Sequence, residues 1–209
     1  MINQQATDRL RREYFHLLPQ MQKLKILLEA NIKWHFKSFA YELKKYQRLE
    51  FESRIKECDS AIESLRRKKH KQGERDFDDS QSYSLKDLKD LIGIRILVFP
   101  VSLITEAGEV ITSKFRNWET DHEKHGDVQI LKYDGFLDED KKIRCEIQLV
   151  PMLTGMFWEV EHSALYKPHP KYKNVKEDLK LKRLYTEILN KFAEFEKTFE
   201  EVVSENDSD

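Results

Sequence analysis

The sequence predicts an α+β domain in which buried strands lie between long helices. Residues 90–99 and 143–149 alternate apolar and other side chains with the period of two that is typical of strands. Residues 8–47, and the stretch from about residue 172 almost to the C-terminus, carry apolar residues at spacings of four and three, as helices do. The chain of 209 residues is long enough to bury a sizeable core.

Composition indicates a helix-rich cytoplasmic protein. Charged residues make up 36% of the chain and the net charge is −1, so overall charge gives no reason to expect nucleic-acid or membrane binding. The two cysteines, Cys58 and Cys145, match no metal-binding spacing and no disulfide framework, which fits a reducing compartment. We find neither the pattern of a signal peptide nor an apolar window of about 18 residues, so no contact with a membrane is expected.

The N-terminal region, residues 1–48, is expected to be helical and to pack against the rest of the protein. A narrow apolar seam runs along it, and Pro19 inside that seam is expected to kink or split the helix. The C-terminal region, residues 171–209, carries a similar seam. We therefore expect the terminal helices to pack together, either within one subunit or across a homo-oligomer.

Residues 49–56 are expected to form a short strand that ends with Arg54 and Lys56 on one face. The stretch Ser60-Ala-Ile-Glu63 has the form of a capping box, so a helix is expected to begin at Ser60. The first backbone N–H groups of that helix would form an anion site beside the two cations. A second capping box at Ser84–Asp87 predicts another short helix.

The strand over residues 90–99 carries two charges that a buried strand does not need. Asp90 stands at its entry and Arg95 in its middle, and a buried charge is costly unless it is paired or bound to a ligand. Two interpretations stay open. The strand forms the floor of a site for a charged ligand, or Asp90 caps a turn and Arg95 pairs with a neighbouring acid.

The pattern is weaker between the two buried strands. Residues 103–115 are expected to be helical, and residues 117–126, which are dense in charge, are expected to form a loop. We interpret His122 and His125 in that loop as solvated side chains rather than metal ligands, because no third ligand is evident. A strand over residues 128–133, followed directly by a turn, is expected next.

The strand over residues 143–149 places Glu146 and Gln148 on its polar face and ends at Pro151. If this strand lies beside the one that follows Asp90, the two carboxylates converge, and they repel unless a cation lies between them. Carboxylate oxygens completed by phosphates suit Mg²⁺. With the cations nearby, this set of residues predicts phosphoryl or nucleotidyl transfer.

Four motifs in order make the chain resemble the RelA/SpoT synthetase domain over roughly residues 49–167. They are Arg54-x-Lys56-x-x-x-Ser60, Asp90-x-x-Gly93-x-Arg95, Glu146-x-Gln148 and Trp158-x-x-Glu161-His162-x-x-x-Tyr166-Lys167, the last on a helix expected over residues 152–166. The resemblance implies a mixed β-sheet flanked by helices, related to nucleotidyltransferases, with a core over residues 49–170. It also implies transfer of the β,γ-pyrophosphate of ATP to the 3′-hydroxyl of GDP or GTP, which gives (p)ppGpp.

The resemblance further implies roles for individual residues. Asp90 would hold Mg²⁺, and Glu146 would share the metal or act as the base. Arg54 and Arg95 would stack on adenine and meet the phosphates. The remaining roles are Lys56 and Ser60 on the ATP phosphates, Lys132, Phe136 and Gln148 on the acceptor side, and Glu161 and His162 as supports from the following helix.

The acceptor side departs from the family pattern. Family synthetases usually carry Gly-Tyr-x-Ser-x-His before Glu-x-Gln, but here the stretch Lys132-Tyr133-Asp134-Gly135-Phe136 lacks the serine and the histidine. Phe136 offers a π-face for stacking but no hydroxyl. Two alternatives therefore stay open. One is transfer to the 3′ end of tRNA, as in toxin relatives, which the basic stretch 44–71 would favour; the other is a nucleotide- or partner-binding domain that has lost turnover.

Overall fold

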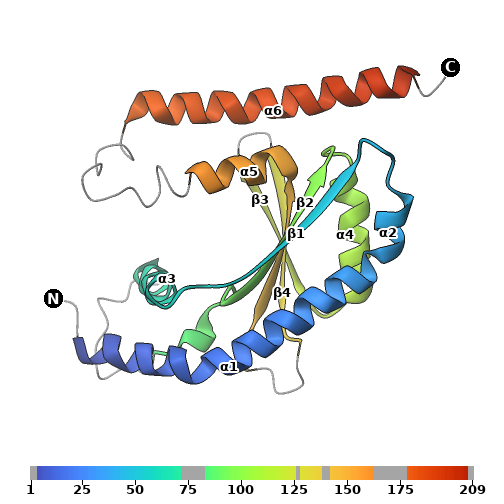
Figure 1. Cartoon of the computed structure of the whole chain (residues 1–209). Helices are drawn as coiled ribbons and strands as arrows, with labels where there is room; N and C mark the ends of the chain where they lie inside the picture. Colours follow the sequence, from blue (N-terminus) through green and yellow to red (C-terminus); the bar gives the residue numbers. More distant parts are fainter. Residues whose placement is uncertain (1–3, 72–82, 126–127, 138–141, 162–177, 207–209) are drawn as a thin grey trace.

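The computed structural model describes residues 4–71, 83–125, 128–137, 142–161 and 178–206, and it consists of one β-sheet with helices on both faces (Figure 1). The α+β class and the long helices near both ends are confirmed. None of the helices in these ranges is long and apolar enough to cross a membrane. In chain order the elements are α1 (Gln4–His35), α2 (Lys37–Glu42), β1 (Arg48–Ile55), α3 (Cys58–Lys71), the 3₁₀ helix η1 (Leu85–Asp87), β2 (Ile92–Phe99), α4 (Leu103–Lys114), β3 (Glu119–His125), β4 (Val128–Gly135), β5 (Cys145–Pro151), α5 (Met152–Glu161) and α6 (Leu179–Asn206).

The five strands form a mixed sheet in the order β1-β2-β5-β4-β3. The central pair β2 and β5 is parallel, and the other three pairs are antiparallel. In this register Gly93 of β2 lies between Arg54 of β1 and Glu146 of β5. The two buried strands predicted from the sequence, β2 and β5, are therefore neighbours, which is the condition for Asp90 and Glu146 to converge.

One face of the sheet is mainly apolar and is covered by α1 and α4, with α3 packed beside α1. The even-numbered positions of β2 from Ile92 to Val98 are buried on this face. The seam of α1, from Leu10 to Ile32, packs in the same cluster. The hydroxyl of Tyr14 in α1 also donates to the backbone carbonyl of Lys56 (2.9 Å), so α1 fixes the chain where it leaves β1.

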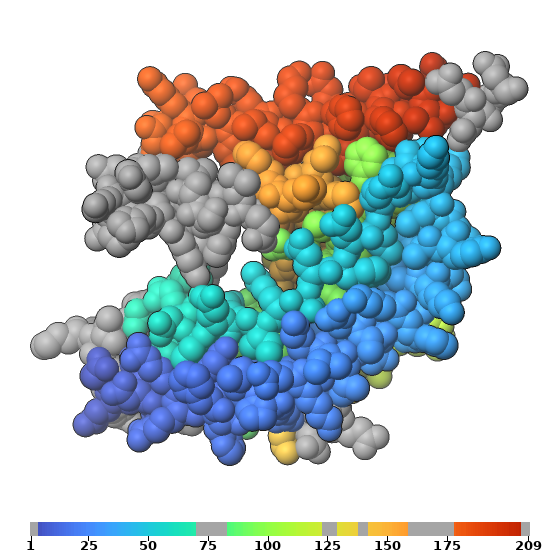
Figure 2. Space-filling model, viewed as in Figure 1, coloured from blue at the N-terminus to red at the C-terminus, as the bar shows by residue number. Residues whose placement is uncertain are grey.

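The opposite face is covered by α5 and α6 over only part of its area. Beneath α5, Leu97, Val150 and Met152 are buried, and Gly155 lets the helix approach closely, because a Cβ there would stand 2.3 Å from Leu97 Cδ2. Nearer the first residues of β2 and β5 this face carries polar side chains instead. Figure 2 shows the surface hollowed between α3 and the layer formed by α5 and α6.

Helix α6 is anchored by aromatic residues and by one buried acid. The ring of Phe199 lies 5.3 Å from that of Phe99, and Phe157 of α5 stacks on Tyr185 at 5.3 Å. Glu196 is only 2% exposed, and the backbone N–H of Val101 donates to it. Burial raises the pKa of Glu196 to about 7.

Two helix predictions are wrong in detail. Helix α1 is neither split nor ended at Pro19, because this residue lies on the exposed side while the apolar seam on the other side stays packed; the break comes at Phe36. Helix α3 begins at Cys58 rather than Ser60, since the N–H of Ala61 already donates to the carbonyl of Glu57 (2.8 Å). Ser60 therefore lies inside the first turn. The capping residue of η1 is Ser84, as predicted, although the element is a single 3₁₀ turn.

Two further expectations are corrected by the sheet. Residues 119–125 form the edge strand β3 instead of a loop, because an edge strand that pairs only with β4 can be charged along its length. Pairing also carries β4 on to Gly135, past the point where a turn was expected. The terminal helices do not pack together within the subunit, since α1 and α6 cover opposite faces of the sheet (Figure 1).

Candidate active site

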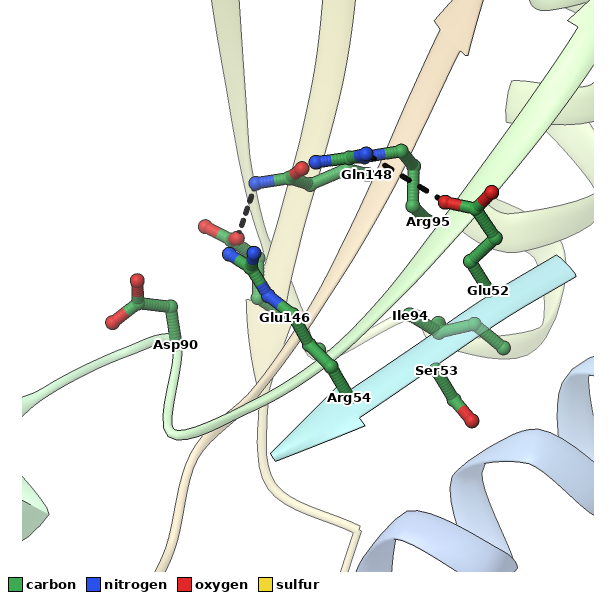
Figure 3. A pocket seen from close by; sticks show the side chains of 9 residues that line it. Glu52, Ser53, Arg54, Asp90, Ile94, Arg95, Glu146 and Gln148 are labelled. Atoms are coloured by element: carbon green, nitrogen blue, oxygen red, sulfur yellow. Dashed lines mark hydrogen bonds and ion pairs between the residues drawn. The ribbon is translucent and has the colours of Figure 1, made fainter. Parts of the chain in front are cut away.

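A cleft of about 360 Å³ opens on the polar part of the sheet (Figure 3). It is lined by Glu52, Ser53, Arg54, Asp90, Gly93, Ile94, Arg95, Glu146 and Gln148. These residues come from the strands β1, β2 and β5 and from the turn before β2. Five of the eleven residues that the sequence pointed to, namely Arg54, Asp90, Arg95, Glu146 and Gln148, line this cleft.

Strand alternation and register place these side chains in two rows across the sheet. Arg54, Gly93 and Glu146 form one row, and Glu52, Arg95 and Gln148 form the next. Gly93 leaves the floor of the first row without a side chain. A Cβ added to Gly93 would have Glu146 O as its nearest neighbour at 3.8 Å, so the surrounding structure has room for a larger residue. The volume that a side chain at position 93 would occupy belongs to the cleft instead.

Of the three carboxylates that line the cleft, Asp90 and Glu146 interact with each other, as expected. Asp90 forms an ion pair with Lys56, and the side-chain amide of Gln148 donates to Glu146 (2.5 Å). Burial raises the pKa of Glu146, and the negative charge of Asp90 raises it further, against the opposing effect of Lys132. The ammonium of Lys56 therefore compensates Asp90 directly, whereas Glu146 is compensated by Lys132 and, to a smaller extent, by Lys56.

Contacts of the residues before and after Asp90 fix its position. Glu13 of α1 accepts hydrogen bonds from the Ser84 hydroxyl (2.5 Å) and from the backbone N–H of Leu85 (3.1 Å), which ties η1 to α1. The backbone N–H of Lys56 donates to the carbonyl of Leu91 (2.9 Å). The turn that carries Asp90 is thus held from both directions.

The two arginines point into the cleft from neighbouring strands (Figure 3). Arg95 lies 3.6 Å from a carboxylate oxygen of Glu52, and its guanidinium lies 5.9 Å from the ring centroid of Trp158 in α5. Trp158 is partly buried and packs against the apolar cluster that contains Leu97. Arg95 therefore meets both an acid and a flat aromatic surface, which suits a side chain that stacks as well as pairs.

The other predicted residues are not among those that the structure shows lining the cleft. Lys132 of β4 is the register partner of Gln148, and it is close enough to Glu146 to lower its pKa. The ring of Phe136 is covered on one face by the guanidinium of Arg144 at 5.2 Å. Ser60 is not among the described residues that line the cleft. The side chain of Glu161 and the whole of His162 lie outside the described residues.

Sequence reasoning missed a cluster of four charges beside the cleft. Lys89 binds Glu119 (2.8 Å) and Asp134 (2.9 Å), and Arg144 binds the same two carboxylates, Glu119 at 2.7 Å. These contacts lower the pKa of Glu119 to about 2 and raise the pKa of Lys89. Two of the four residues are on β3 and β4, so only correct pairing of those strands could have revealed the cluster.

The cleft also contains Glu52, which sequence reasoning passed over. Alternation along β1 places it on the same face as Arg54, and the signal for its role is its register partner, Arg95. Among the described residues, no group of three or more His, Cys, Asp or Glu side chains could hold a metal ion. A cation at Asp90 and Glu146 would therefore need oxygen ligands from a bound molecule.

Comparison with known proteins identifies the fold. No family model and no curated protein matches the sequence. The small alarmone synthetase 1 of Bacillus subtilis bound to its product pppGpp superposes with a TM-score of 0.69 at 19% identity, over 93% of this chain and 98% of that one. The same synthetase bound to AMPCPP gives 0.64 at 16% identity, over 95% and 100% of the two chains.

A third solved structure agrees with these two. A GTP pyrophosphokinase family protein from Streptococcus pneumoniae gives a TM-score of 0.58 at 17% identity, over 92% of this chain and 93% of that chain. Because the similarity extends along nearly the whole of each chain, it concerns the complete architecture, including the terminal helices. This chain therefore has the fold of the RelA/SpoT-type small alarmone synthetases.

Proposed function

We propose that this protein is an ATP-dependent pyrophosphokinase that transfers the β,γ-pyrophosphate of ATP to the 3′-hydroxyl of GDP or GTP. The observation that carries the proposal is the meeting of two arginines with the carboxylates of Asp90 and Glu146 in one cleft, on a sheet with the small alarmone synthetase fold. Arg54 and Arg95 suit the ATP side, since a planar guanidinium can both stack on adenine and pair with phosphate oxygens. Lys56, between β1 and α3, and Ser60, in the first turn of α3, would bind the phosphates.

Glu146 is suited to the role of base. Its raised pKa makes it a stronger proton acceptor than an ordinary glutamate, and the bond from Gln148 orients one of its oxygens. In the proposed transfer the 3′-oxygen bonds to the β-phosphorus, the bond from that phosphorus to the oxygen bridging to the α-phosphate breaks, and AMP leaves. The hydroxyl proton passes to Glu146.

The carboxylates fit a divalent cation. Asp90 and Glu146 repel each other, and hard oxygen ligands completed by phosphates are the set that Mg²⁺ prefers. An ion held there would neutralise negative charge on the phosphates. On the acceptor side Lys132, Gln148 and the face of Phe136 away from Arg144 would bind the second nucleotide.

A direct test uses the full chain with γ-³²P-ATP and Mg²⁺, offering GDP, GTP and deacylated tRNA in separate reactions. The proposal expects label on a guanine nucleotide, with AMP formed in equal amount. Asp90→Asn should abolish the transfer. Glu109→Gln is a matched control, because this exposed carboxylate lies on α4, which covers the opposite face of the sheet, and it should leave the rate unchanged.

Two results would contradict the proposal in different ways. Label that moves only to tRNA would replace the guanine nucleotide with the acceptor of the toxin-like alternative. ATP binding without transfer to any of the three acceptors would instead favour a domain that binds nucleotide and has lost turnover.

A further inference from the structure

A second, strongly basic hollow lies beside the cleft. It has a volume of about 340 Å³ and is lined by Lys68, Lys69, Lys86, Asp87, Lys89 and Arg144. These residues come from the last turns of α3, from η1, and from the residues directly before β2 and β5. Below we call this set of six residues the basic hollow.

The frame of the basic hollow is held by specific contacts. The ammonium of Lys68 donates to the backbone carbonyl of Asp87 (2.6 Å), which joins α3 to η1. Lys69 lies 5.8 Å from the ring centroid of Tyr83, a buried residue. On the other side, Lys89 and Arg144 share the carboxylates of Glu119 and Asp134, as described above.

The charges of the basic hollow do not cancel. Among the described residues, its five cations face the lining carboxylate of Asp87 and the two carboxylates of Glu119 and Asp134, which leaves an excess of two positive charges. Glu119 and Asp134 pair with Lys89 and Arg144, whereas Lys86 is an exposed lining residue. Like charges held close together favour a bound anion that carries several negative charges.

The basic hollow and the cleft are lined by residues that are neighbours in the chain. Lys89 directly precedes Asp90, and Arg144 precedes Glu146 by two residues on the same side of the strand. Asp134, which holds both cations, is the register partner of Glu146. A ligand in the hollow therefore lies next to the proposed base.

We infer that the basic hollow binds a polyphosphate group. Four of its five cations are lysines, whose ammonium groups act as point charges and donate hydrogen bonds to phosphate oxygens in several directions. The polyphosphate could be the 5′-diphosphate or 5′-triphosphate of the acceptor nucleotide, or a free polyphosphate. Only the first source rests on the proposed function.

Binding without turnover tests the inference. Sodium tripolyphosphate is titrated calorimetrically into the full chain and into Lys86→Glu and Lys23→Glu variants. Lys23 is the matched control, since it is an exposed lysine on α1 and its reversal changes the net charge equally. Lys86→Glu should weaken binding by about tenfold or more, and Lys23→Glu should leave it within about twofold. Arg54→Glu, which alters the cleft instead, should retain a component of binding that is sensitive to Lys86→Glu.

Competition with GDP distinguishes the two sources. If the 5′-phosphates of the acceptor fill the basic hollow, tripolyphosphate displaces GDP, and Lys86→Glu weakens GDP binding but not guanosine binding. If GDP and tripolyphosphate bind together, the ligand is a free polyphosphate. Equal affinities in the Lys86→Glu and Lys23→Glu variants would overturn the inference. Because no transfer is measured, a chain that lacks pyrophosphokinase activity can still give either result, so the two proposals fail separately.

Discussion

Replacing Glu146 with glutamine separates catalysis from stability at one position. The variant loses the proposed base and one proposed metal ligand, so transfer should fall by at least about 10²-fold. Stability should not fall, because the glutamine carbonyl can still accept the hydrogen bond from Gln148 and the repulsion from Asp90 disappears. An active-site acid differs in this respect from a structural one, whose removal destabilises the fold.

The effect on stability depends on pH in a definite direction. The pKa of Glu146 is raised in the folded protein above its ordinary value of 4.5, so the folded state holds this proton more tightly than the unfolded state does. The stability that results is fully present below pH 4.5 and is lost as pH rises through the folded pKa. The glutamine variant has no such loss. Its Tm should therefore match the wild type near pH 4.5 and exceed it increasingly toward pH 7.5.

The assay compares thermal melts and label transfer for three variants across this pH range. Asp90→Asn should lose both activity and about 1–2 kcal/mol of stability, because it leaves the ammonium of Lys56, only 14% exposed, without its carboxylate partner. Glu109→Gln should change neither quantity. A Tm for Glu146→Gln several degrees below that of the wild type at pH 7.5 would refute the reasoning, because Glu146 would then stabilise the fold as an ion.

Three further outcomes follow from other parts of the structure. The pKa of Glu196 is raised from 4.5 to about 7, so ionisation of this residue destabilises the folded protein at high pH. The free energy of unfolding of Glu196→Gln should therefore exceed that of the wild type by up to roughly 3 kcal/mol at pH 8 and equal it at pH 4.5. Urea midpoints that are the same for variant and wild type at both pH values would contradict this. Gly93→Ala should keep the wild-type Tm but slow transfer by about 10²-fold, as a misplacement of about 1 Å can; full activity would mean that substrate does not approach this strand. Gly155→Ala should cost about 1–3 kcal/mol in urea unfolding because its Cβ would collide with Leu97, and an unchanged midpoint would show that α5 can move away from the sheet.

The central part of the site could be predicted from the sequence because its signals are local. Alternation in residues 92–99 and 145–151 is visible in the chain itself, and it assigns each side chain to a face without knowledge of the partners. Charges at Asp90, Arg95 and Glu146 then stand out against an apolar background. The prediction that Asp90 and Glu146 converge needed one further condition, that β2 and β5 are neighbours, and the structure meets it.

The remaining features depend on partners that are distant in sequence. Strand β3 carries no apolar alternation, and it is a strand because β4 pairs with it. The charge cluster at Glu119 and Asp134 could not be found before that pairing was known. The seams of α1 and α6 were visible, but a seam only requires an apolar partner, and each helix packs on a different face of the sheet.

The alternation of core and cleft residues along each strand limits how this protein can vary in length. Inserting a single residue into β5 ahead of Glu146 would exchange the two faces of the strand. Ile147 would then face the cleft and the Glu146 carboxylate would face the apolar interior, so folding and catalysis would fail together. An insertion of two residues would preserve the faces but shift Glu146 by one row, away from Gly93 and opposite Arg95 or beyond the strand. Viable insertions and deletions in relatives of this chain should therefore lie between the strands, while differences in substrate arise from substitutions at positions that already face the cleft.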